Sequence, residues 1–271
     1  MGPRPSGRAA AGARSPGTPG GGGRAAGGEA GGASPAQAAR HRHGARRRAR
    51  RARRGAEAAA EAWREARAAG LAAAQALVNA LLERRYLAQR PLGSLGEPRF
   101  RDLGLLEVAA EKIKRRAARE LAAVDRALAG LEDSLHQFGE AQAILRGEEP
   151  LGDSPGVASP TGATPLSSAQ YHTLEASRPV FSALPMPAYQ ALLAKVVAGY
   201  VGELEVKRGV HATLEEVYRS ETRPPGGAEG AEDPAGEWEM HLAAWMLEPC
   251  LDETRLQDFC TLVDEELKAA G

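Results

Sequence analysis

Apolar residues recur every three or four positions over five stretches of this chain, a pattern typical of amphipathic helices. The first stretch runs from about residue 56 to residue 89 and carries one apolar stripe on a background rich in alanine. The stripe comprises Trp63, Ala66, Gly70, Ala74, Leu77 and Leu81. Arg90-Pro91 ends this predicted helix, because proline disfavours helical backbone at the residue before it.

The second stretch, from about residue 105 to residue 145, is the most regular part of the sequence. From Leu121 to Phe138 its apolar positions follow a repeat of 3.5 residues, which predicts a coiled-coil-like seam. About 40 helical residues would extend roughly 60 Å, so part of the seam should face another helix or another chain. The residues predicted to bind a partner here are Leu121, Val124, Leu128, Leu131 and Leu135.

The C-terminal third predicts one long helix and two short ones. The long helix begins near Pro187, and its apolar residues lie on one broad face as far as Val217. The short helices span about 238–247 and 252–268, with Glu248-Pro249 between them. Asp252 is the expected N-cap of the last helix, because its carboxylate can accept from the first turn.

The remaining segments lack hydrophobic periodicity. Residues 1–55 form an Arg/Gly/Ala-rich arm and residues 147–177 a Pro/Ser linker, and we expect both to be disordered. Helical units should then occupy 56–146, as a hairpin, and 178–271, interrupted by a flexible acidic loop at 222–236. The predicted fold class is all-α: a small helical bundle with a long coiled-coil-like hairpin, plus disordered arm and linkers.

Charge divides the chain into two halves of opposite sign. Residues 1–54 hold 13 of the 35 basic residues and one of the 35 acidic residues, so this part carries +12 and the rest −12. The densest cluster comprises Arg46, Arg47, Arg48, Arg50, Arg51, Arg53 and Arg54. Three interpretations remain open: a nuclear import signal, an arm that binds nucleic acid through its phosphates, or a solvated tail.

The sequence shows no catalytic motif. It contains no phosphate-binding loop, dinucleotide fingerprint, HExxH, GxSxG or kinase signature. Cys250 and Cys260 lie ten residues apart without a CxxC, and the six histidines are scattered, which disfavours a metal site. No apolar run approaches the roughly 20 residues of a membrane span. We therefore expect a non-enzymatic protein with no cofactor, no metal and no membrane partner.

The linker contains Ser/Thr-Pro dipeptides. Ser154, Ser159 and Thr164 each precede a proline, and proline-directed kinases act on such extended sites. These three residues are hypothetical phosphorylation sites. The same dipeptides are also common in disordered linkers that have no regulatory role.

Several pieces of the sequence, occurring in order, are similar to the cyclin-dependent kinase 2-interacting protein family. The match covers about residues 56–267, and a weaker part of it lies between Trp63 and Asn79 and includes Ala69-Gly70. The stronger pieces are Arg178-Pro179-x-Phe181, Tyr200-x-x-Glu203-Leu204-x-x-Lys207-Arg208 and Leu242-x-x-Trp245-Met246-x-Glu248-Pro249.

The resemblance implies a nuclear adaptor that acts in DNA replication, the DNA-damage checkpoint, cell division and ribosome maturation. It implies binding to cyclin-dependent and origin-firing kinase complexes, to the ATR-interacting protein and to subunits of a AAA ATPase complex. The sequence departs from the family in its Arg-rich N-terminus and in the acidic insertion at 222–236. Nucleic-acid binding through the arm is the alternative function.

The long C-terminal helix offers a candidate contact surface. Tyr200, Leu204 and Lys207 share one face, flanked by Glu203 and Arg208, and an aromatic, an aliphatic and a cation together are typical of a contact patch. The other interpretation is that this face belongs to the core, which the pattern favours for Leu204. Trp245 presents the same choice, with burial again favoured.

Overall fold

The computed structural model describes residues 35–89, 104–148, 181, 184–222 and 235–269, and these residues form an all-α bundle without a strand. The predicted fold class is therefore confirmed. The helices are α1 (Pro35–Gln89), α3 (Leu105–Arg146), α5 (Met186–Thr222), α6 (Ala235–Leu247) and α7 (Glu253–Lys268). The predicted cap of the last helix is also confirmed, since the Asp252 carboxylate accepts from the Thr254 backbone N–H at 3.2 Å.

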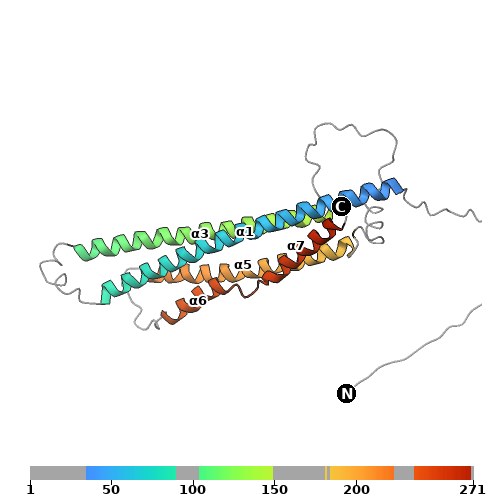
Figure 1. Ribbon diagram of the computed structural model, residues 1–271. Helices are drawn as coiled ribbons and strands as arrows, with labels where there is room; N and C mark the ends of the chain where they lie inside the picture. The colour runs from blue at the N-terminus through green and yellow to red at the C-terminus, as the bar shows by residue number, and fades with distance from the viewer. Residues whose placement is uncertain (1–34, 90–103, 149–180, 182–183, 223–234, 270–271) are drawn as a thin grey trace, which may run out of the picture.

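The helices build an up-and-down bundle of four rods, the last of which is broken. Helices α1 and α3 run antiparallel along most of their length, and α5 runs back alongside them (Figure 1). Helices α6 and α7 follow one another along α5 in the opposite direction and contact α1 and α5 (Figure 1). The break between them lies at residues 248–252. The arrangement buries a core that runs the length of the bundle.

Small residues let α1 and α3 approach closely. A Cβ on Gly55 would lie 3.3 Å from the Ala141 Cβ, and one on Gly130 would lie 3.1 Å from the Ala66 Cβ. In the same interface the buried Ser134 hydroxyl donates to the Ala59 carbonyl oxygen at 2.5 Å. This packing explains how a chain with few aromatic residues can bury long helices against each other.

Two groups of buried side chains make up the core, and Tyr200 packs against both. The Tyr200 ring lies edge-on to Trp63, with centroids 5.0 Å apart, and tilted against Phe138, with centroids 4.4 Å apart. Such aromatic pairs contribute stabilisation beyond the area they bury. Tyr200 therefore joins the two halves of the core.

The expected boundary of the disordered arm is wrong for its last part. Helix α1 begins at Pro35, so residues 35–55 are helical and extend the helix expected from residue 56. Alanines on one face of this segment are fully buried and belong to the same core group as Phe138 and Leu145. The arginines between them hide this periodicity from a hydrophobicity pattern. The predictions for residues 1–34, 149–177 and 223–234 lie outside the described residues.

Candidate partner-binding site

Several of the residues that carry the family resemblance come together at one place in the bundle, whereas Phe181 packs elsewhere, against Tyr189. They lie on three elements that are far apart in the sequence: the middle of α1, the middle of α5, and the end of α6 with the turn after it. The residues brought together are Trp63, Gly70, Tyr200, Glu203, Lys207, Trp245 and Glu248. We call this set the α6 clamp.

A buried ion pair on α5 forms one side of the α6 clamp. The Lys207 ammonium lies 2.6 Å from the Glu203 carboxylate, and both side chains are fully buried. Lys207 also donates to the carbonyl oxygens of Ala244, at 3.1 Å, and Trp245, and its ammonium lies 5.7 Å from the centre of the Trp245 ring. A cation at the last carbonyls of a helix satisfies acceptors that have no partner within the helix. Lys207 thus fixes the end of α6.

The turn after α6 is held from two directions. The second Glu203 oxygen accepts from the Cys250 backbone N–H at 3.1 Å. Glu248, whose φ of 47° is left-handed, accepts from the Trp63 indole N–H at 3.0 Å and pairs with Arg67 on α1. A non-glycine residue in this conformation persists only where its surroundings hold it. The turn is therefore fixed to both α1 and α5.

The buried members of this set do not form a contact surface. Glu203, Leu204, Lys207 and Trp245 are all interior side chains, so the prediction that they contact a partner is wrong for this conformation. The physical reason is that α6 and the turn after it cover Glu203 and Lys207, while Trp245 lies on the face of α6 that packs against α1. For Leu204 and Trp245 the core interpretation was the favoured one, and it is confirmed.

Tyr200 is half-buried and lies at the edge of a cavity. Burial raises the pKa of its hydroxyl to about 12, with nearby Arg64 acting against the shift and Glu248 adding to it. Together with Trp63 and Cys260 it lines a cavity of about 590 Å³ beside α7. Tyr200 is thus mainly a core residue with one accessible edge.

The predicted seam on α3 is also largely satisfied within the chain. Val124, Leu128 and Leu131 are buried in the same core group as residues of α1 and α5, while Leu121 and Leu135 are half-buried. The expectation that part of the seam faces another helix is met by α1. The expectation that these residues bind a partner is wrong for the three buried ones.

Arg208 is the exposed member of the predicted site. Its guanidinium pairs with Glu132 on α3 and with Glu205 on α5, each at 2.7 Å. Hydrogen bonds to these two carboxylates raise the pKa of Arg208 above its usual value. The residue therefore bridges α3 and α5 on the surface.

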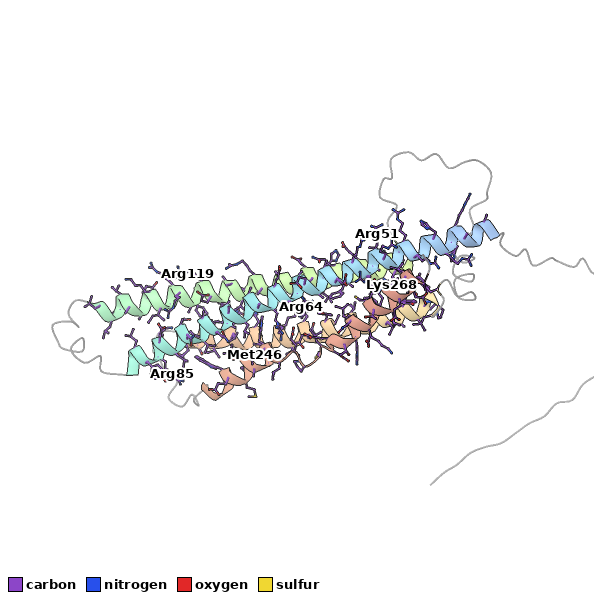
Figure 2. All side chains as sticks on the ribbon, viewed as in Figure 1. Arg51, Arg64, Arg85, Arg119, Met246 and Lys268 are labelled. Atoms are coloured by element: carbon purple, nitrogen blue, oxygen red, sulfur yellow. The ribbon has the colours of Figure 1, made fainter. Side chains whose placement is uncertain are left out.

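The face of α6 that points away from the α6 clamp carries three exposed apolar side chains, with the exposed Glu239 among them. Met240, Met246 and Leu247 expose 64%, 54% and 70% of their surface. At about 100° per residue they span an arc of about 120°, while Trp238 and Trp245 lie on the opposite, buried face. Figure 2 shows Met246 on this helix. We call these three residues the α6 apolar arc.

Sequence reasoning missed this arc. A 13-residue helix with large apolar side chains on opposite faces was a usable signal, because a helix of this length normally turns only one apolar face to the core. Here one face is enclosed by the α6 clamp and the other is not. Exposed apolar side chains grouped on one face in this way mark interaction sites.

The proposed import cluster lies on α1. Arg47, Arg50, Arg51 and Arg54 are exposed, and Arg46, Arg48 and Arg53 are partly buried. Arg53 pairs with Asp264 on α7 and with Glu57, each at 2.9 Å. The proposed phosphorylation sites Ser154, Ser159 and Thr164 lie outside the described residues.

Among the described residues, no group of three or more potential ligands is placed to hold a metal ion. His211 pairs with Asp125 at 2.5 Å across α5 and α3, and Cys250 and Cys260 are unbridged. Burial, together with the nearby Glu57 carboxylate, raises the pKa of the Cys260 thiol to about 11. None of the helices in the described ranges combines the length and apolarity needed to cross a bilayer.

Comparison with protein-family models, with curated proteins and with solved structures finds no match for this chain. The resemblance noted in the sequence therefore stays an expectation about family and function.

Proposed function

We propose that this chain is a non-enzymatic helical adaptor of the nucleus that binds partner proteins through the α6 apolar arc. The partners implied by the resemblance are cyclin-dependent and origin-firing kinase complexes, the ATR-interacting protein and subunits of a AAA ATPase complex. The single observation that carries the proposal is the exposure of Met240, Met246 and Leu247 on a helix whose other face is fixed.

The way α6 is held supports a role in presentation. Lys207 binds the last carbonyl groups of α6, and Trp245 packs against α1, so the helix is held before any partner arrives. A surface ordered in advance costs less conformational entropy on binding. Methionine adds side chains that adapt to different apolar partners. An apolar arc on an exposed helix fits the apolar face of an amphipathic partner helix.

The test compares two triple variants of the full-length protein in nuclear extract. The first variant carries Met240→Gln, Met246→Gln and Leu247→Gln, which removes the apolar side chains and keeps good helix formers. The matched control carries Leu105→Gln, Val108→Gln and Val201→Gln, which removes three other exposed apolar side chains from α3 and α5. Recovered proteins are identified with antibodies to the kinase and AAA ATPase subunits.

We expect the wild type and the control to recover these subunits and the α6 variant to recover them at least tenfold less. Thermal melting should be the same for all three, because only exposed side chains are changed. Equal recovery by both variants would refute the assignment to the α6 apolar arc. Recovery of none of these subunits by the wild type would refute the proposed partners.

A further inference from the structure

The first turns of α1 carry a dense positive charge without any compensating residue in the same segment. Residues 35–56 contain nine arginines and no aspartate or glutamate. At about 100° per residue, five exposed cationic or titratable side chains fall within an arc of about 80°. They are Arg40, His43, Arg47, Arg50 and Arg54. We call them the α1 basic stripe.

The opposite face of the same segment fixes the stripe in place. Ala45, Ala49, Ala52 and Ala56 lie about 180° from the stripe and are fully buried in the core. The arginines of the stripe therefore project from a helix that is packed along much of this length. The first turns of α1 extend past the end of α3 (Figure 1). At 1.5 Å per residue, the distance from Arg40 to Arg54 is about 21 Å along the axis.

Two arginines outside the stripe, Arg48 and Arg53, have neighbours within the fold. Arg53 pairs with Glu57 and Asp264. The Arg48 guanidinium lies beside Gly147, at the C-terminal end of α3. The stripe faces away from these groups, towards solvent. The stripe is thus an exposed part of the cluster, and the exposed Arg42 and Arg51 lie outside it.

We propose that the α1 basic stripe binds the phosphate backbone of double-stranded DNA without sequence preference. A duplex carries one negative charge per roughly 1.7 Å of its axis, so about 12 charges lie within the 21 Å of the stripe. Arginine guanidinium groups match phosphate geometry and stay charged at all physiological pH values. This activity is independent of partner binding by the α6 apolar arc.

The composition of the stripe selects this ligand over others. Single-stranded nucleic acid is bound largely by stacking on aromatic side chains, and the stripe has only His43 as a ring. A membrane-surface helix needs large apolar residues opposite its cations, whereas here the opposite face is alanine packed in the core. Asparagine and glutamine, which read base edges, do not occur between residues 38 and 56. These features favour binding of the stripe to the phosphate backbone of a DNA duplex.

The experiment measures fluorescence anisotropy of a labelled 20-base-pair DNA duplex with the full-length protein between 50 and 200 mM salt. The test variant carries Arg40→Gln, Arg47→Gln, Arg50→Gln and Arg54→Gln. The matched control carries Lys112→Gln, Arg115→Gln, Arg119→Gln and Arg126→Gln, which removes the same charge from exposed positions on α3. Figure 2 shows Arg51 and Arg119 towards opposite ends of the hairpin. On α3, Glu111, Glu120 and Asp125 lie among the cations.

Four phosphate contacts predict that wild-type affinity falls about 100-fold between 50 and 200 mM salt. We expect the affinity of the test variant for the duplex to be lower by a factor on the order of ten, and its dependence on salt to be shallower. The control should bind like the wild type. Circular dichroism melting should not differ among the three proteins, because the changed side chains are exposed.

Four results would overturn the proposal. The first is equal DNA binding by the test variant and the wild type, and the second is an equal loss of binding in the control. The third is tighter binding of single-stranded DNA or duplex RNA than of duplex DNA. The fourth is competition by polyglutamate that is as effective as competition by unlabelled duplex. The last result would assign the stripe to acidic proteins instead.

Discussion

The ring of Trp245 on α6 lies directly against the backbone of Gly70 on α1. A Cβ on Gly70 would overlap this ring and would lie 3.0 Å from the Ala127 Cβ, and the Trp245 indole N–H donates to the Arg67 carbonyl oxygen at 3.1 Å. Glycine is therefore required at this position for α6 to approach α1. The contact explains why a glycine interrupts the apolar stripe of an alanine-rich helix.

Gly70→Ala should destabilise the protein, whereas Gly139→Ala should stabilise it. Alanine improves helix propensity at both positions by about 1 kcal/mol, but at Gly70 overpacking against a buried ring costs about 1–3 kcal/mol. A Cβ on Gly139 would meet nothing within 4 Å. Urea unfolding measures both free energies. A change of the same sign and size in the two variants would contradict the close contact.

Removal of the Lys207 ammonium should be strongly destabilising. Lys207→Met leaves the Glu203 carboxylate buried without its partner, and such a change typically costs about 3–5 kcal/mol of unfolding free energy. The double variant with Glu203→Gln should regain part of this loss. The control is Arg208→Met, at the next residue of α5, which breaks a surface ion pair with Glu132. It should lower the unfolding free energy by about 1 kcal/mol or less. Chemical denaturation measures all of them, and equal losses for Lys207 and Arg208 would refute the role of the α6 clamp.

The N-terminal extension of α1 should contribute to folding stability. Ala49→Gln forces a larger side chain into a fully buried position, which costs about 1–3 kcal/mol. Arg50→Gln changes the exposed neighbour and should stay within about 0.5 kcal/mol of the wild type. Thermal melting distinguishes them. If Ala49→Gln melted like Arg50→Gln, residues 35–55 would not be packed as part of the bundle.

The Cys260 thiol should react slowly at neutral pH and faster as the pH rises. Its pKa is raised to about 11 by burial and by Glu57, so the fraction of reactive thiolate grows about tenfold per pH unit between pH 8 and 10. A Cys250→Ser variant isolates this thiol, and alkylation followed by mass spectrometry gives the rate. A rate that levels off near pH 9 would contradict the raised pKa.

The raised pKa of Cys260 also predicts how the free energy of unfolding changes at alkaline pH. An unfolded thiol has a pKa of about 8.5, so the stability linked to a protonated Cys260 is fully present below that pH. It is lost as the pH rises towards about 11. Tyr200, with its pKa raised to about 12, contributes in the same direction above pH 10. We expect Tyr200→Phe to weaken the dependence of urea unfolding on pH between 10 and 12, and an unchanged dependence would contradict this.

The spacing of apolar residues was enough to predict the helices and most of their ends. The expected helix of about residues 105–145 is α3, Leu105–Arg146, and the expected start near Pro187 is close to the observed start at Met186. Periodicity of this kind is visible within a few turns of chain and needs no information from elsewhere. The exception is residues 35–55, where alanine is the buried residue and arginine dominates the composition.

Which residues are exposed was decided only by tertiary packing. The spacing placed Tyr200, Leu204 and Lys207 on one face of α5, but it did not show that α1, α3 and α6 together cover this face. Lys207 can be buried only because Glu203 and two carbonyl groups about 40 residues away neutralise and bind its ammonium. The sequence alone thus determined the helices and their faces. Contacts between distant helices decided which face is core and which is surface, because burial depends on neighbours that local spacing does not specify.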